Sequence, residues 1–134
     1  MDVPVNYLAV VVVALVNYAI GSLWYGVLFR KPWQRLAGMS EMKVSAVSVI
    51  VALVGAFFTS YILAHAVIFA GTYMKTSGVG LGLTTGFFNW LGFIAPVTIG
   101  VVIYEKKPFM YWVLNNAYWL ISLLVMGVIL SLWK

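Results

Sequence analysis

Four long runs of apolar residues, uninterrupted by Lys, Arg, Asp or Glu, dominate the sequence. They cover residues 5–29, 44–70, 80–104 and 110–133. The hydrocarbon core of a bilayer is about 30 Å thick, and about 20 apolar residues cross it as an α-helix. The strands of a transmembrane barrel would instead be short segments of alternating polarity, and these runs do not alternate. The sequence therefore predicts an all-α membrane protein in which residues 1–134 form one integral membrane domain, a four-helix transmembrane bundle made of two helical hairpins.

The composition agrees with lipid as the main solvent of the chain. Hydrophobic residues make up 64% of the chain and charged residues 8%, whereas a soluble domain carries about 25% charged residues. The net charge is +5, but the basic residues lie at the ends of the apolar runs. Nucleic-acid binding, which needs them clustered on one polar surface, is therefore not predicted. The chain has no cysteine, which excludes disulfides, thiolate catalysis and cysteine-ligated metals.

Basic residues are unevenly divided between the two sides of the predicted bundle. The connections at 30–43 and 105–109 carry six Lys and Arg residues, whereas the opposite side carries two, Lys75 and Lys134. Positive residues are enriched on the cytoplasmic side of membrane proteins. We therefore expect loops 30–43 and 105–109 in the cytoplasm and both chain termini outside, an N-out/C-out topology.

The first connection has the features of a short helix at the membrane interface. Pro32 suits the first turn of a helix, and three apolar side chains then share one face: Trp33, Leu36 and Met39. Such a helix is typical of the headgroup layer. Ser40 is predicted to cap the second span.

The same connection resembles the third one in its order of residue types. Residues 30–33 and 106–109 both read basic, basic, proline, aromatic. This similarity fits a duplicated hairpin. It also fits convergence, because the interface favours basic and aromatic residues at both places.

Small residues recur at helical spacing within the apolar runs, a pattern typical of helix contacts in membranes. In the third run Gly78, Gly82 and Gly86 form a repeated Gly-x-x-x-Gly pattern. In the second run the stripe comprises Ser45, Ser48, Ala52, Gly55, Thr59, Ile62 and Ala66. These seams either close the bundle or bind another copy of the chain. Because four helices of this length enclose little interior, seams on several helices favour a homo-oligomer.

Uncharged polar residues also lie inside the apolar runs. At a rise of about 1.5 Å per residue, four of them fall near mid-membrane and are expected to form a hydrogen-bonded layer: Asn17, Ser60, Asn89 and Ser122. Asn115 and Asn116 fall nearer the cytoplasmic side. Such residues are either contacts between helices, contributing about 0.6 kcal/mol each, or parts of a polar pathway or ligand site.

Pro96 and His65 are the two other unusual residues of the runs. Pro96 removes one hydrogen bond of the third helix and predicts a kink there. Apart from the tyrosines, His65 is the single ionisable side chain inside a run. By default such a residue is a functional candidate; the alternative is a structural histidine that satisfies its own hydrogen bonds. Without a second His, Cys or carboxylate at depth, it predicts no metal site.

The acidic residues exclude the common catalytic arrangements. Asp2, Glu41 and Glu105 all lie at predicted membrane edges, so no carboxylate pair and no Ser-His-Asp triad is within reach. A Gly-Lys-Ser/Thr phosphate motif is also missing. The sequence predicts no cofactor and argues against an enzyme without settling the question, His65 being the one candidate base.

Clusters of aromatic, glycine and asparagine residues recur along the chain. They are Asn6-Tyr7-Leu8-Ala9-Val10, Gly21-x-x-Trp24-Tyr25-Gly26, Lys31-Pro32-Trp33, Trp90-Leu91-Gly92-Phe93-x-Ala95-Pro96 and Asn115-Asn116-Ala117-Tyr118-Trp119-Leu120. In this order they resemble an uncharacterised family of bacterial and archaeal membrane proteins, domain of unknown function family 1761. The resemblance runs over most of the chain and implies four spans in a prokaryotic cytoplasmic (inner) membrane. It implies no reaction, substrate or catalytic residue.

Two functional hypotheses from different classes follow. The first is a small homo-oligomeric transport or permeation protein, whose polar path would use Asn17, Asn89 and Asn116 and be shaped by Pro96. The second is a non-transporting scaffold or partner subunit that binds a lipid or an apolar ligand against three deep tryptophans, Trp24, Trp90 and Trp119. These tryptophans alternatively only fill the bundle. A solvated polar path would favour the first hypothesis, and a dry interior with a tryptophan-lined groove the second.

Overall fold

Four apolar helices form the body of the protein. The computed structural model describes residues 2–41 and 43–133, and within them it contains no strand and four helices long and apolar enough to cross a membrane. These helices are Tyr7–Leu28, Ala46–Met74, Val79–Ile103 and Phe109–Leu132. The predicted all-α fold with four spans is thereby confirmed. Lys134, which contributes to the charge distribution above, lies outside the described residues.

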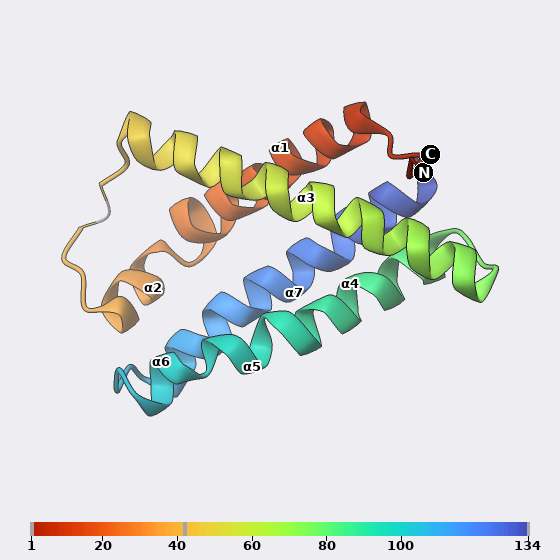
Figure 1. Cartoon of the computed structure of the whole chain (residues 1–134). Helices are drawn as coiled ribbons and strands as arrows, with labels where there is room; N and C mark the ends of the chain where they lie inside the picture. Colours follow the sequence, from red (N-terminus) through yellow and green to blue (C-terminus); the bar gives the residue numbers. More distant parts are fainter. Residues whose placement is uncertain (1, 42, 134) are drawn as a thin grey trace.

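Two of the four spans are not uniform α-helices (Figure 1). In chain order the elements are α1 (Tyr7–Leu23), the π-helical turn η1 (Trp24–Leu28), α2 (Arg30–Ala37), α3 (Ala46–Met74), α4 (Val79–Phe93), α5 (Ala95–Thr98), α6 (Gly100–Ile103) and α7 (Phe109–Leu132). The first span is α1 continued by η1, and the third is α4 continued by α5 and α6. Both termini lie at one end of the bundle with the α3–α4 connection, which we call the termini end. The opposite end, with α2 and the α6–α7 connection, is the α2 end.

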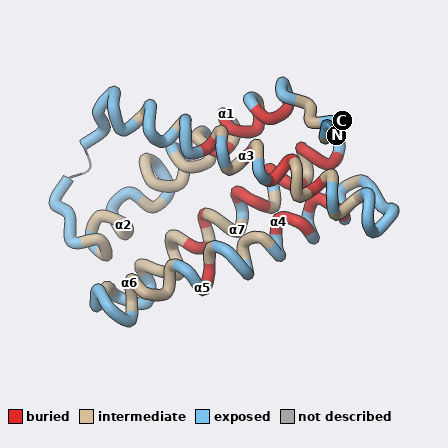
Figure 2. The backbone as a smooth tube through the Cα atoms, viewed as in Figure 1, coloured by how far each residue is buried: buried red, intermediate tan, exposed pale blue. Residues whose placement is uncertain are grey.

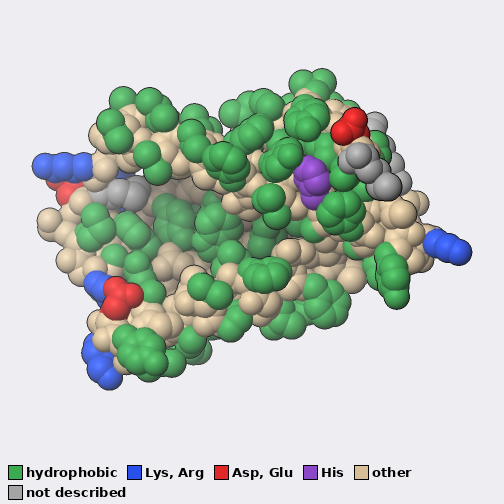
Figure 3. All heavy atoms as spheres, in the orientation of Figure 1, with side chains coloured by type: hydrophobic (Ala, Val, Ile, Leu, Met, Phe, Trp, Pro, Cys, Tyr) green, Lys and Arg blue, Asp and Glu red, His purple; other side chains and the backbone are tan. Residues whose placement is uncertain are grey.

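The helices pack as two hairpins, α1 with α3 and α4 with α7. Helix α7 also contacts α1 and α3 and so joins the hairpins. The core consists of Ala9, Val10, Val13, Leu63, Ala64, Val67, Leu81, Leu123, Met126 and Leu130. Buried residues are concentrated towards the termini end, whereas most residues at the α2 end are intermediate or exposed (Figure 2). Hydrophobic side chains cover the middle of the visible face, with the Lys and Arg side chains at its two ends (Figure 3), as a lipid-facing surface requires.

Glycines let α4 and α7 approach at backbone contact. A Cβ atom at Gly82 would overlap the backbone of Gly127, and one at Gly86 would overlap the carbonyl of Leu123. Gly78, the third member of the predicted pattern, has a different role: it precedes α4 with φ +89°, and a Cβ there would meet nothing within 4 Å. Helix α4 therefore uses two of the three glycines for close packing.

The small-residue stripe of α3 does not close the bundle. Its members Ser45, Ser48, Ala52 and Gly55 are exposed, and a Cβ at Gly55 would meet nothing within 4 Å. The face that α3 buries lies one residue further round the helix and consists of Ala56, Ser60, Leu63, Ala64 and Val67. Spacing alone identifies a stripe but not its neighbour, and here α1 and α7 cover the adjacent face. Contact of the stripe with a second copy of the chain stays a prediction.

The helix ends in the first connection depart slightly from expectation. The short helix is present as α2, with Pro32 in its first turn, where the missing N–H costs no helical bond. Its last residue is Ala37, and Gly38, which adopts φ +76°, caps its C-terminus. The prediction that Ser40 caps the next span is wrong, because Ser45 caps α3 in a reciprocal pair with Ser48. Ser40 has a lysine three residues later, which cannot accept a hydrogen bond in return.

Candidate functional site

The mid-membrane polar residues do not form the expected layer. Asn17 accepts a hydrogen bond from the hydroxyl of Tyr118 (2.9 Å) and points its amide nitrogen at the sulfur of Met126 (3.2 Å). The remaining three bond elsewhere: Ser60 to the carbonyl of Val10, Asn89 to the carbonyl of Thr85, and Ser122 to the Met126 sulfur. Only Asn17 and Ser122 share a partner. Each of the four side chains instead donates to an acceptor on its own helix or on an adjacent one.

His65 is tied to its own helix rather than to a reactive group. Its Nδ1 lies 2.8 Å from the carbonyl oxygen of Tyr61, and its ring lies edge-on to the Tyr61 ring at 4.5 Å. The imidazole is half-buried and visible on the surface in Figure 3. Within residues 2–41 and 43–133, no group of three His, Cys, Asp or Glu residues comes close enough to hold a metal ion. This geometry fits a structural histidine.

The third span is broken on both sides of Pro96. Helix α4 ends at Phe93, and a second interruption at Ile99 separates α5 from α6. The carbonyl oxygen of Ile94 accepts from the Thr98 hydroxyl (2.7 Å), and that of Ala95 accepts from the Trp112 indole (3.3 Å). The Ile94 carbonyl also accepts from the backbone N–H of Thr98 (3.0 Å), so of the two it is the Ala95 carbonyl that bonds to another helix, α7.

Opposite this break, α7 carries Asn115, whose carboxamide is held in one orientation. Its Oδ1 accepts from the Tyr25 hydroxyl at 2.7 Å and from the Trp33 indole nitrogen at 3.2 Å. An indole N–H only donates, so the atom facing Trp33 must be the amide oxygen. The amide nitrogen faces the other way and makes no hydrogen bond to another described residue. Asn115 thus keeps two N–H donors available.

Thr98 is the second centre of this cluster. Its hydroxyl accepts from the Trp112 indole (3.1 Å) and from the Asn116 amide (3.0 Å), while it donates to the carbonyl of Ile94. Asn116 also donates to the carbonyl of Trp112, and its own backbone carbonyl accepts from the Trp90 indole at 3.1 Å. Because every group has a defined role, the cluster is preorganised.

A cavity of about 220 Å³ lies beside these two centres. Its lining consists of Tyr25, Thr98, Val101, Tyr111, Trp112, Asn115, Asn116 and Trp119. Of the described residues that line it, none carries a charge, so its chemistry is hydrogen bonding and aromatic contact. We call the cavity, its lining residues and Trp33 the Asn115 site.

Helix α2 is held over the α2 end at two points. The Trp33 indole donates to Asn115. At the last residue of α2, the carbonyl of Ala37 accepts from the ammonium of Lys107, which lies in the α6–α7 connection, at 2.9 Å. The same ammonium lies 5.9 Å from the centre of the Tyr111 ring, a cation–π distance. A positive charge near the last carbonyls of a helix also interacts favourably with the helix dipole. These contacts fix the position of Trp33.

The sequence predicted part of the Asn115 site. It singled out Asn115, Asn116 and Trp119, which all line the cavity. Trp90 only supports Asn116, and Trp24 lies beside Phe29 and Tyr118 with its indole N–H unpaired among the described residues. The site residues that the sequence did not indicate are Tyr25, Trp33, Thr98, Val101, Tyr111 and Trp112. The usable signal in the sequence was a polar residue, Thr98, two positions after Pro96. The π-helical turn η1, which carries Tyr25 and is of a kind frequent at functional sites, became visible only in the structure.

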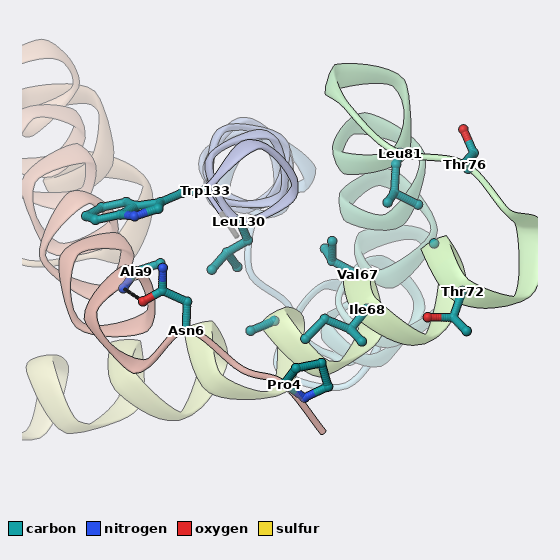
Figure 4. A pocket seen from close by; sticks show the side chains of 12 residues that line it. Pro4, Asn6, Ala9, Val67, Ile68, Thr72, Thr76, Leu81, Leu130 and Trp133 are labelled. Atoms are coloured by element: carbon teal, nitrogen blue, oxygen red, sulfur yellow. Dashed lines mark hydrogen bonds between the residues drawn. The ribbon is translucent and has the colours of Figure 1, made fainter. Parts of the chain in front are cut away.

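A larger cavity, of about 410 Å³, lies at the termini end between α1, α3, α4 and α7 (Figure 4). Its apolar walls are Ala9, Ala64, Val67, Ile68, Leu81 and Leu130. The polar residues that line it are Asn6, Thr72 and Thr76, and Pro4, Gly71 and Trp133 complete it. The sequence did not predict this cavity: Asn6 and Ala9 appeared only in a cluster that carries the family resemblance, and apolar residues in apolar runs carry no distinguishing pattern. We call this space the termini-end cavity.

The chain matches one known protein family over most of its length. The profile of the family described as "Protein of unknown function (DUF1761)" matches residues 8–131. The chain belongs to this family. The match includes the Asn115 site and all four spans except the first residue of the first span and the last residue of the fourth. It confirms the resemblance drawn from the aromatic clusters. No curated protein and no solved structure matches the chain.

Proposed function

We propose that this integral membrane protein is a non-transporting binder of a small amphipathic, lipid-like molecule, held at the Asn115 site. The observation that carries the proposal is the orientation of Asn115. Two donors occupy its oxygen, so its N–H groups remain for an acceptor on a ligand. Aromatic side chains with a few convergent polar groups are typical of ligand sites.

The size of the cavity suggests which part of the ligand it holds. An apolar cavity of about 150 Å³ accommodates benzene, and the cavity here measures about 220 Å³. It would therefore hold a group of about one substituted ring, or the polar end of a lipid. A carbonyl or ester oxygen would accept from Asn115 while the apolar remainder lies among the helices or in the bilayer.

The arrangement of the deep polar residues favours binding over permeation. Asn17, Ser60 and Ser122 are buried and directed at partners within the bundle instead of following one another along a path. Backbone contact between α4 and α7 leaves no room for a file of water there. A permeation path would have to form between copies of the chain, where the exposed stripe of α3 is the expected contact.

Replacing Asn115 tests the proposal. We expect native mass spectrometry of gently extracted wild-type protein to detect one discrete added mass. Asn115→Leu should lower its occupancy about tenfold, because one hydrogen bond contributes about 1 kcal/mol and an unpaired group costs more. The matched control is Asn89→Leu, whose amide bonds only its own helix.

Val101→Trp provides a second variant that keeps every hydrogen bond of the site. Val101 lines the cavity, so the larger side chain should fill it and displace the ligand while the melting temperature stays near that of wild type. Equal occupancy in wild type, Asn115→Leu and Val101→Trp would contradict the proposal, as would the lack of any added mass on wild type. The same spectra report whether the protein is a homo-oligomer.

We also propose that the protein lies in the cytoplasmic membrane with its α2 end inside. The wild-type chain has no cysteine, so single Ser→Cys variants report sidedness cleanly. Ser40 and Ser77 are both exposed and lie at opposite ends of the bundle. A membrane-impermeant maleimide should label Ser77→Cys in intact cells and Ser40→Cys only after permeabilisation. The reverse pattern would overturn this orientation.

A further inference from the structure

One wall of the termini-end cavity offers water no hydrogen-bond partners. Ala9, Val67 and Leu81 are almost fully buried members of the core, and they form this wall together with Ala64, Ile68 and Leu130. A buried water needs two to four polar partners, and these side chains supply none. Protein interiors are close-packed, so a space of about 410 Å³ calls for an apolar occupant.

The polar groups of this cavity come from the segments that leave the bundle. Asn6 precedes α1, Thr72 lies in the last turn of α3, and Thr76 follows it. The Asn6 carboxamide oxygen caps α1 by accepting from the N–H of Ala9 at 3.1 Å, which leaves its nitrogen to donate elsewhere. Among the described lining residues there is no charged side chain. The rim therefore suits a neutral acceptor such as an ester carbonyl.

Figure 4 looks along α7 and shows how the two kinds of side chain are arranged. Leu130 extends from α7 towards Val67 and Ile68 of α3, while Asn6 and Pro4 lie on the segment before α1. The side chains between the helices are thus apolar, and the polar side chain of Asn6 lies at the edge of the cavity, where the chain enters α1.

We propose that the termini-end cavity binds one acyl chain of a membrane lipid, with the chain against Ala64, Val67 and Leu130 and its ester carbonyl at the Asn6 amide. This is a second site, at the opposite end of the bundle from the Asn115 site. Its occupant differs in the part that is recognised, a hydrocarbon chain instead of a polar or ring-shaped group. The volume lies within the range of about 300–1,000 Å³ typical of ligand pockets.

A photoactivatable phosphatidylcholine, carrying a diazirine near the end of one acyl chain, tests the site in vesicles that contain the full chain. We expect saturable labelling of Ile68, Leu81 or Leu130, located by peptide mass spectrometry. Ala64→Phe should reduce it at least tenfold by filling the space. Ala52→Phe, the same change on the exposed stripe of the same helix, should leave it unchanged.

Three further arms of the experiment keep the result decisive. Ile68→Trp enters the cavity from a half-buried position and should also abolish labelling if Ala64→Phe is poorly folded. Asn115→Leu should not affect it, which separates this site from the proposed function. Photoactivatable palmitate, with its free carboxylate, should label these residues at least tenfold less. Unsaturable labelling spread over all lipid-facing helices, labelling retained in both filled variants, or labelling by palmitate alone would overturn the proposal.

Discussion

Gly82→Ala is expected to destabilise the protein by about 2–3 kcal/mol, since extra atoms in a well-packed contact typically cost about 1–3 kcal/mol and sometimes more. In thermal unfolding this corresponds to a fall on the order of 10 °C in melting temperature. The added Cβ would overlap the Gly127 carbonyl and the backbone of Val128 on α7. A backbone atom cannot rotate away as a side chain can, so the two helices must separate along their length.

Gly80→Ala is the matched control for this prediction. It lies in the same helix, and a Cβ there would meet nothing within 4 Å. Alanine is the better helix former by about 1 kcal/mol, so this variant should melt at the wild-type temperature or slightly above it. Thermal unfolding in detergent, followed by helical circular dichroism, measures both. Equal melting temperatures for the two variants would show that α4 and α7 are not in backbone contact.

Met126→Ala is expected to cost about 3 kcal/mol, because truncating a buried methionine typically costs about 2–5 kcal/mol. The Met126 side chain is completely buried at the centre of the core, where α7 meets α1 and α3. Its sulfur also faces the amide of Asn17 and the hydroxyl of Ser122. Truncation would therefore leave a cavity and two buried donors without their acceptor.

Two controls separate these causes. Met126→Leu keeps the volume but removes the sulfur, so its smaller cost, below about 1.5 kcal/mol, measures the polar contacts. Met110→Ala changes an exposed methionine of the same helix and should alter stability by less than about 0.5 kcal/mol. The measurement is unfolding in mixed micelles as the fraction of denaturing detergent rises. A loss at Met110→Ala as large as at Met126→Ala would contradict the core position of Met126.

The Asn115 site shows how far the sequence leads towards a function. Three of its residues stood out individually. Asn115 and Asn116 did so because a polar residue inside an apolar run is costly, and Trp119 because it lies deep in its run. Their partners did not. Tyr25 and Trp33 lie 90 and 82 positions before Asn115, and nothing in the spacing of one chain pairs residues so far apart.

The small residues illustrate the same limit within the fold. The glycine spacing identified Gly82 and Gly86, which pack against α7. The longer stripe of α3 was equally regular, yet the structure leaves Ala52 and Gly55 exposed. Regular spacing defines a face of a helix, but the face that is covered depends on where the neighbouring helices lie.

The sequence by itself determined the solvent, the number of spans, their helical character and the family, since the absence of water in a bilayer forces an uncharged apolar run to satisfy its backbone as a helix. Only the tertiary structure decided which faces meet, where the third span breaks around Pro96, and that two cavities lie at opposite ends of the bundle. The physical reason is that apolar side chains lie on all sides of these helices. Hydrophobicity therefore does not distinguish lipid from protein neighbours, and the choice rests on backbone approach and on a few directional hydrogen bonds.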